Sequence, residues 1–189
     1  MFRSASFGPE THLAQAAASD SVQLVTNAFD DLLAANRRFA ETFALSGFDG
    51  VAHAGVAVVT CMDSRIDPLG MLGLEPGDAK IFRNPAGRVT EQALEALVLG
   101  AHLLNVNRIL VVPHTRCAMA SSTQEELRKR VGESAGQDAS WQRFGVVEDQ
   151  EAALADDVRR VRSHPLIPDT VEVGGFIYDV DTGLLTQLV

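Results

Sequence analysis

The stretch VAVVTCMDSRIDP, residues 56–68, decides which fold the sequence predicts. It opens with an unbroken apolar run that ends in one threonine, which is typical of a strand buried on both faces of a parallel sheet. Cys61 follows this run at once, and Asp63 and Arg65 come directly after it. Because open parallel sheets bind their ligands beyond the carboxyl ends of the strands, these side chains indicate a functional site.

Strands and helices alternate on both sides of this stretch. Before it, apolar residues fall near one face of a helix predicted over residues 21–45, which SGFDG at 46–50 ends. These apolar residues are Val25, Phe29, Leu32, Phe39 and Phe43. After it, the pattern predicts a short strand through Ile81 and Phe82 and a helix capped by Thr90. The later elements are a strand at 108–113, polar-faced helices at 123–131 and 148–162, a strand at 171–180, and a hairpin strand at 184–189.

This alternation predicts an α/β fold with a mainly parallel sheet, flanking helices and a C-terminal antiparallel hairpin strand. We expect a single domain over residues 21–189, because neither an internal repeat nor a flexible linker interrupts it. Residues 1–20 are rich in Ala and Ser and weakly patterned, so we expect an N-terminal arm there.

The overall charge argues against some classes of partner. The formal net charge is −9, whereas nucleic acid and acidic membrane surfaces both favour basic patches. No apolar run approaches the ~20 residues that span a bilayer. The first 21 residues also hold no continuous apolar segment of the kind found in secretory signals. We therefore expect a soluble, cytoplasmic protein that binds neither nucleic acid nor membrane.

The chain has two cysteines, and their number alone leaves a buried inert pair, a metal site and a disulfide or redox pair open. Cys117 stands in PHTRCAM, residues 113–119, which follows the second predicted buried strand. If the two strands are neighbours, Cys61, His114 and Cys117 converge. Two thiolates and an imidazole suit zinc, and three protein ligands leave the fourth position open, as in catalytic sites. A lone histidine at a strand end is more often structural, but Cys117 three residues later favours metal binding.

Four motifs together resemble those of the β-class carbonic anhydrases, in order and at similar separations. They are CMDSR at 61–65, GDA at 77–79, RNxAG at 83–87 and HxxC at 114–117. The likeness covers roughly residues 22–189, including a GFIYDxxTGxL ending like that of the short bacterial members. The resemblance implies a parallel sheet with flanking helices and an added antiparallel strand. It also implies an N-terminal helix that packs across a dimer, and hence a homodimer or a dimer of dimers.

By this resemblance, Cys61, His114 and Cys117 are the ligands of a Zn²⁺ cofactor, and Asp63 and Arg65 are the catalytic pair beside it. The implied enzyme is a carbonic anhydrase, a lyase that reversibly hydrates CO2 to bicarbonate and a proton. Its nucleophile would be a zinc-bound hydroxide that the Asp–Arg pair orients. Because two thiolates cancel the formal charge of Zn²⁺, we expect activity to rise at alkaline pH. Asp63 and Arg65 could instead be an ordinary surface ion pair, but their place directly after Cys61 favours the catalytic role.

Three further positions are expected to support the site. Asp78 and Arg83 fit scaffolding polar contacts better than chemistry. Gly87 would either let the backbone approach a bound substrate or shape its loop.

The sequence also departs from the family pattern. Pro113 and Ala118 replace glycines, Arg116 stands where a small or acidic residue is common, and Pro85 is inserted into RNAG. Relatives of the family hydrolyse CO2 analogues, so hydrolysis of carbonyl sulfide or carbon disulfide stays an alternative. A zinc-binding protein whose altered loop has lost catalysis is a second alternative, although the intact Asp–Arg pair counts against it.

Overall fold

The computed structural model describes residues 28–189. They belong to two compact units, one that ends at Ala44 and one that spans Leu45–Val189. The predicted arm at 1–20 and the first part of the helix predicted at 21–45, Val25 included, lie outside the described residues. The boundary between arm and domain therefore stays a prediction.

The first unit contains helix α1, Asp30–Ala40. Its first turn holds two acidic residues and its last turn two basic ones, which suits the helix dipole. The predicted extension of this helix to residue 45 is wrong. After Ala40, the carbonyl of Phe39 accepts both the N–H and the hydroxyl of Thr42, which turns the chain out of the helix.

The apolar side chains of this first unit are largely exposed within it. Leu32, Leu33, Phe39 and Phe43 each expose about half of their surface or more. The rings of Phe39 and Phe43 contact each other, with centroids 5.7 Å apart. The described part of this unit, residues 28–44, therefore presents an apolar surface that these residues do not cover themselves.

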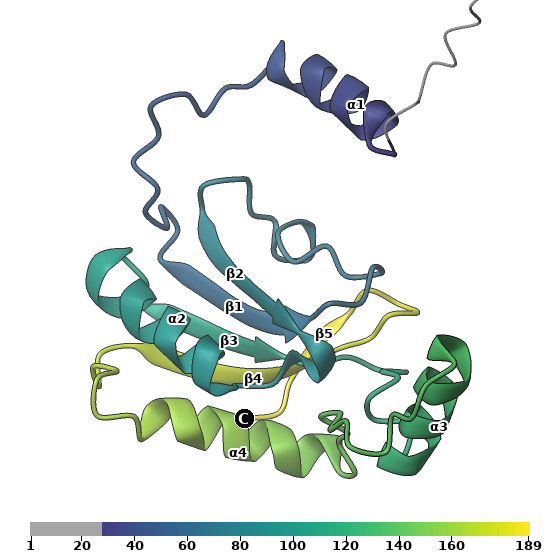
Figure 1. The fold of residues 1–189 in the computed structure, drawn as a ribbon. Helices are drawn as coiled ribbons and strands as arrows, with labels where there is room; N and C mark the ends of the chain where they lie inside the picture. The colour runs from purple at the N-terminus through teal and green to yellow at the C-terminus, as the bar shows by residue number, and fades with distance from the viewer. Residues whose placement is uncertain (1–27) are drawn as a thin grey trace, which may run out of the picture. The chain divides into compact units, whose positions relative to one another are not determined.

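The second unit is built on a five-stranded sheet (Figure 1). Its strands are β1 (Val56–Cys61), β2 (Ala79–Asn84), β3 (Arg108–Val112), β4 (Glu172–Tyr178) and β5 (Leu185–Gln187). They lie in the order β2-β1-β3-β4-β5, and all neighbours are parallel except the antiparallel pair of β4 and β5. The predicted fold class is confirmed.

Two helices pack on one face of this sheet. α2 (Glu91–Leu103) contacts β1 and β2, and α4 (Gln150–Arg162) contacts β3 and β4. Alternate residues of the central strands join both helices in one core, which includes Val59, Leu97, Val111, Val158 and Val161. α2 begins as predicted, with the Thr90 hydroxyl accepting the N–H of Ala93.

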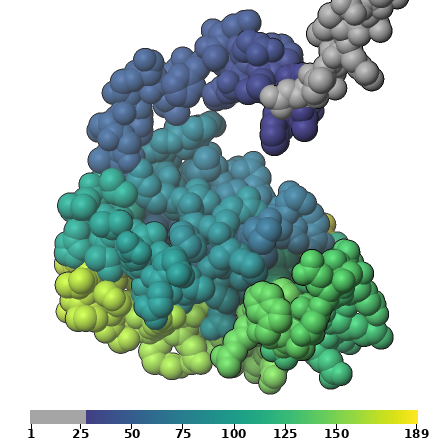
Figure 2. Space-filling view, viewed as in Figure 1, coloured from purple at the N-terminus to yellow at the C-terminus, as the bar shows by residue number. Residues whose placement is uncertain are grey.

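α3 (Gln124–Ala135) lies outside these layers, and Figure 2 shows its part of the chain, in green, as a lobe at one side of the second unit. Thr123 and Glu126 form a reciprocal cap at its start. The helix runs past the predicted end at residue 131, because Gly132 weakens a helix without ending it. It ends instead at Gly136, whose φ is 63°.

Two short 3-10 helices, Gly70–Leu72 and Pro85–Gly87, complete the second unit. Over residues 28–189, no helix combines the length and the apolar character needed to cross a membrane.

Candidate active site

The parallel pairing of β1 with β3 brings two strand ends together. Thr60 lies opposite Val112, and its buried hydroxyl donates a hydrogen bond of 2.7 Å to the Val112 carbonyl. Cys61 is the last residue of β1, and His114 follows β3 after one proline. The predicted donors therefore leave neighbouring strands at the same edge of the sheet.

Cys61, His114 and Cys117 converge at this edge. Their candidate ligand atoms, two Sγ atoms and a ring nitrogen, all lie within 4.8 Å of one another, and all three side chains are buried. Both cysteines are free thiols. The convergence expected from the two strand ends is thus observed.

The His114 ring is oriented by one hydrogen bond and leaves its other nitrogen unpaired. Nδ1 lies 2.8 Å from the Thr115 carbonyl oxygen, which can only accept, so Nδ1 carries the proton. Nε2 then holds the lone pair; it is buried, and no described residue hydrogen-bonds to it. Burial lowers the pKa of His114, which favours the neutral imidazole that ligates metals. A buried unpaired acceptor is unfavourable, and a metal ion would satisfy it.

The cysteine side chains complete a donor set that fits zinc. Burial raises the pKa of the Cys117 thiol, while the backbone N–H groups of Met119 and Ala120 act in the opposite direction. A bound divalent cation favours the thiolate form and releases its proton. Two cysteines and one histidine fill three positions of a tetrahedral zinc site.

Asp63 and Arg65 form a two-pronged ion pair beside the donor cluster. Arg65 donates from Nε to Oδ1 of Asp63 at 2.9 Å and from Nη2 to Oδ2 at 2.8 Å, and its backbone N–H also donates to Oδ1. These bonds hold the pKa of Asp63 well below its usual range, so the carboxylate is ionised. Oδ2 of Asp63 lies 3.8 Å from Nε2 of His114, which places an acceptor-only group at the edge of the cluster.

Comparisons with known proteins point to one family. A family model described as carbonic anhydrase matches residues 56–185. The β-carbonic anhydrase 1 of Mycobacterium tuberculosis is 31% identical over 166 residues, with 84% of this chain and 96% of the relative covered. A solved carbonic anhydrase from Streptococcus mutans has a TM-score of 0.77 at 34% identity, and the match covers 88% of this chain and 100% of that one. The chain belongs to the β-carbonic anhydrase family.

The family recognised from the four motifs is therefore confirmed, as is the prediction of an enzyme of the carbonic anhydrase class. A further relative carries another activity in its name: a carbon disulfide hydrolase from an Acidianus species is 33% identical over 174 residues. That match covers 78% of this chain and 84% of the relative.

The departures from the β-carbonic anhydrase pattern lie mainly in the ligand loop, residues 113–118. The carbonyl of Pro113 accepts the N–H of Tyr178, and the N–H of Thr115 donates to the carbonyl of Tyr178. These two bonds, of 3.0 and 2.9 Å, continue the pairing of β3 with β4 into the loop. In this loop, which lacks the usual glycines, Arg116 takes a φ of 53°.

Arg83 makes the scaffolding contacts that its place in the motif predicted. Its Nε donates to the carbonyl of Cys61 at 2.8 Å, and its Nη2 donates to the carbonyl of Asp63 at 2.6 Å. Asp78 accepts the N–H of Glu75 in the turn before β2. Arg83 therefore bridges the backbone of a candidate ligand, Cys61, and that of the candidate catalytic carboxylate, Asp63.

Gly87 lies against the end of β1. Its φ is +67°, and a Cβ at this position would come within 2.9 Å of the backbone nitrogen of Cys61. Of its two predicted roles, shaping the loop is the one the structure displays. Only glycine tolerates both the positive φ and the close approach to the backbone of Cys61.

A buried ion pair that sequence reasoning missed holds the loop after Gly87. Arg88 donates from Nε to Oδ2 of Asp157 at 2.5 Å and from Nη2 to Oδ1 at 3.1 Å, and the Val89 N–H donates to Oδ2. Asp157 is only 3% exposed. Its signal in the sequence was a carboxylate on the apolar face of α4, between Leu154 and Val158.

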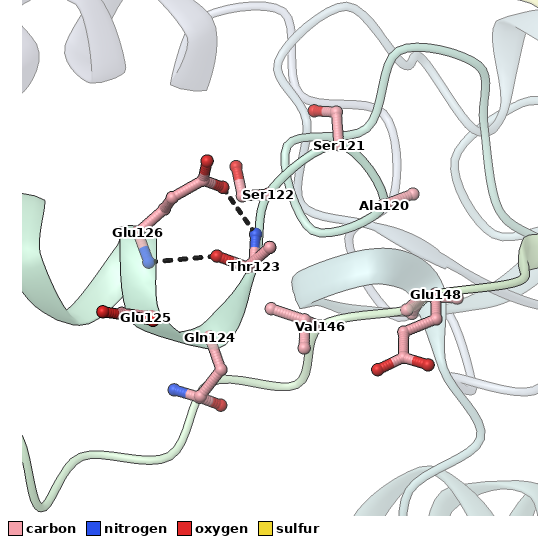
Figure 3. A pocket seen from close by; sticks show the side chains of 10 residues that line it. Ala120, Ser121, Ser122, Thr123, Gln124, Glu125, Glu126, Val146 and Glu148 are labelled. Carbon is pink, nitrogen blue, oxygen red and sulfur yellow. Dashed lines mark hydrogen bonds between the residues drawn. The ribbon is translucent and has the colours of Figure 1, made fainter.

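A pocket of about 690 Å³ lies beyond the ligand loop, lined by residues 120–126 and 146–148 (Figure 3). Glu125, Glu126 and Glu148 line it, and Glu126 is bonded to Thr123 in the cap of α3. Carboxylates repel an anion such as bicarbonate, so this pocket is a poor candidate for the family's substrate.

Proposed function

We propose that the protein catalyses the zinc-dependent, reversible hydration of CO2 to bicarbonate and a proton. The observation that carries this proposal is the unpaired Nε2 of His114. It faces two buried cysteines and lies beside an ionised, two-pronged Asp63–Arg65 pair. A structural histidine would be expected to have both of its nitrogens satisfied.

Cys61, His114 and Cys117 would hold the Zn²⁺ ion and leave its fourth position open. Bound there, zinc lowers the pKa of a water molecule so that hydroxide is available, though less strongly with two thiolate ligands than with three imidazoles.

Asp63 and Arg65 would orient the reacting group. An ionised carboxylate can only accept hydrogen bonds, so Asp63 would accept the hydrogen bond of a neighbouring hydroxyl group. This would leave a lone pair of the hydroxyl oxygen free to attack the carbon of CO2. Arg65 holds both carboxylate oxygens, which prevents Asp63 from swinging onto the metal position itself.

The surroundings of the cysteines suit an uncharged substrate. Ile66, Ala86 and Val147 are buried in the same apolar cluster as Cys61 and Cys117. CO2 is small and apolar, so such walls accept it without loss of hydrogen bonds. Bicarbonate is charged, so the same apolar walls favour its release.

The test is CO2 hydration across pH on protein whose zinc content has been measured. We expect about one zinc per chain, and a rate per zinc that rises with pH above neutrality. Cys117→Ser should lose most of the zinc, because two protein ligands are too few for stable tetrahedral binding. Full zinc occupancy in that variant would remove Cys117 from the ligand set. Fully loaded wild-type protein with no CO2 hydration up to pH ~9 would overturn the proposed function.

Carbon disulfide hydrolysis is the second candidate, because a carbon disulfide hydrolase is 33% identical to this chain. The same protein sample should be given carbon disulfide and carbonyl sulfide. Turnover of these compounds without CO2 hydration would favour the second candidate, and zinc without any turnover would favour a non-catalytic zinc protein.

The assembly and location complete the proposal. The exposed apolar side chains of α1, Leu32, Leu33 and Phe39, support a homodimer or a dimer of dimers, in which a second chain would cover them. Two free cysteines that are needed as thiolates support a reducing compartment, and hence the cytoplasm.

A further inference from the structure

Side chains as well as backbone tie the ligand loop to the turn between β4 and β5. Nη2 of Arg116 lies 2.6 Å from Oδ1 of Asp181, and the hydroxyl of Thr115 accepts the N–H of Val180 at 3.1 Å. On the other side of the same peptide segment, the carbonyl of Arg116 accepts Nη2 of Arg65 at 3.4 Å. One residue thus contacts the turn through its side chain and the Asp63–Arg65 pair through its backbone.

We propose that Arg116 and Asp181 are positioning residues for the Asp63–Arg65 pair. Their ion pair fixes the Arg116 peptide, whose carbonyl steers Arg65, and Arg65 in turn aims the carboxylate of Asp63. The inference rests on the proposed function, because it concerns the same reaction.

The turn that carries Asp181 is itself well ordered by hydrogen bonds. Oδ1 of Asp179 accepts the N–H groups of Asp181 at 2.8 Å and of Thr182 at 3.3 Å. The backbone of Asp179 also bonds to Leu184 and Gly183 across the hairpin. These hydrogen bonds hold the backbone of Asp181, so its carboxylate has a defined position beside Arg116.

The backbone of Arg116 needs such an anchor. Its φ of 53° lies in the left-handed region, which a long L side chain adopts only where its surroundings enforce it. The contact with Asp181 and the two backbone bonds that Tyr178 makes with Pro113 and Thr115 supply that enforcement. If the ion pair is lost, Arg116 can relax and its carbonyl can turn away from Arg65.

Asp181 also acts on Arg65 through its charge. Hydrogen bonding to Asp63 is the main reason why the pKa of Arg65 is raised, and the negative charge of Asp181 adds to this effect. Arg65 is thus bonded to one carboxylate, that of Asp63, and also feels the charge of a second one, that of Asp181.

Two other roles for Arg116 make different predictions. An ordinary exposed ion pair would affect neither kcat nor KM, and both side chains are more than half exposed. A guanidinium that attracts bicarbonate directly would become more effective once Asp181 no longer neutralises it. The effect of removing only the Asp181 charge therefore separates the three roles.

The experiment compares Asp181→Asn with Asp156→Asn in full-length, zinc-loaded protein. Asp156 and Arg159 form a control pair on α4 with the same separation of 2.6 Å and a similar exposure. We expect Asp181→Asn to lower kcat by about two- to fivefold with KM unchanged, and Asp156→Asn to change neither. An Asp181→Asn kcat equal to that of the control would overturn the inference, and so would a lower KM for bicarbonate at unchanged kcat.

Two further variants test whether the effect passes through Arg65. In an Arg65→Lys background, which lacks the second nitrogen that reaches the Arg116 carbonyl, Asp181→Asn should cause no additional loss. The charge swap Arg116→Asp with Asp181→Arg should restore kcat, since Asp tolerates a positive φ and the ion pair is re-formed. A full additional loss in the first case, or no rescue in the second, contradicts the inference. Inactive wild-type protein would instead count against the proposed function.

Discussion

The Asp63–Arg65 and Asp157–Arg88 pairs share the same two-pronged contact but differ in surroundings and in sequence separation. In the first pair the side chains are 20% and 40% exposed, and the two residues are only two positions apart along the chain. In the second, Arg88 is 34% exposed but Asp157 is almost fully buried, and the two lie 69 residues apart. One pair stands beside the donor cluster, and the other holds the loop behind it.

Burial and location, not the chemistry of the contact, decide what such a pair does. Water screens the exposed pair, so it adds little to stability, which is compatible with the orienting role that we propose for it. The buried pair cannot be separated without leaving an unpaired charge in the interior, so its role is structural.

The largest effect should come from removing one partner of the buried pair. Arg88→Ala leaves Asp157 without its cation and should lower the free energy of unfolding by about 3–5 kcal/mol. Arg65→Ala, the matched change in the exposed pair, should lower it by less than about 1 kcal/mol. Urea unfolding of both variants measures this difference. Equal losses would show that burial does not distinguish the two pairs.

The next largest effect is on activity, where we expect the exposed pair to matter more than the buried one. Asp63→Asn should lower kcat/KM for CO2 hydration by about 10²-fold at unchanged zinc content, because an amide can present its NH2 group to the hydroxyl oxygen and misalign the nucleophile. Arg65→Ala should also lose activity while zinc stays bound. Arg88→Ala, assayed well below its unfolding temperature, should keep activity within a few-fold of wild type. Activity of Asp63→Asn near that of wild type would remove this pair from the mechanism.

A smaller effect tests whether the loop at Gly87, which joins the Asp157–Arg88 pair to the donor cluster, constrains Cys61. Gly87→Ala should lower the unfolding free energy by about 1–3 kcal/mol, because the new Cβ meets the backbone of Cys61 in a left-handed conformation. Gly73→Ala is the control, since Gly73 has a similar φ of +65° but no atom near its Cβ position. Only the Gly87 variant should also bind zinc more weakly, as measured by competition with a chelator. Equal zinc affinity in both variants would show that the loop does not constrain Cys61.

The smallest effect is on the free energy of unfolding at acidic pH. Because the folded-state pKa of Asp63 is lowered, the unfolded chain binds a proton at this residue first as pH falls. The stabilisation from Asp63 is therefore complete above its unfolded pKa of about 4 and declines below it. In metal-free protein, wild type and Asp63→Asn should converge in unfolding free energy between pH 5 and 3, by less than about 1 kcal/mol. A gap that widens toward pH 3 has the wrong sign for this pair.

The sequence was sufficient for the features that depend on local pattern and strand ends. The buried run before Cys61 and the one before His114 predicted parallel strands, and parallel strands bring their ends to one edge. Asp157–Arg88 was beyond such reasoning, because the apolar face of α4 indicates that Asp157 is buried but not which distant cation lies opposite it. The contact of Arg116 with Asp181 was hidden for the same reason, since it joins a loop to a turn 65 residues later.

The hydrogen bonds of Tyr178 with Pro113 and Thr115 have a consequence for how the protein is made. Ribosomes synthesise the chain from its N-terminus, so the candidate ligands emerge well before the hairpin segment that holds their loop. A nascent chain that ends before Tyr178 has both cysteines and the histidine but lacks the partner strand of the ligand loop. Because long-range pairing forms late, we expect zinc capture to follow the docking of β4 during biosynthesis. Incomplete chains would then bind little of the cell's zinc.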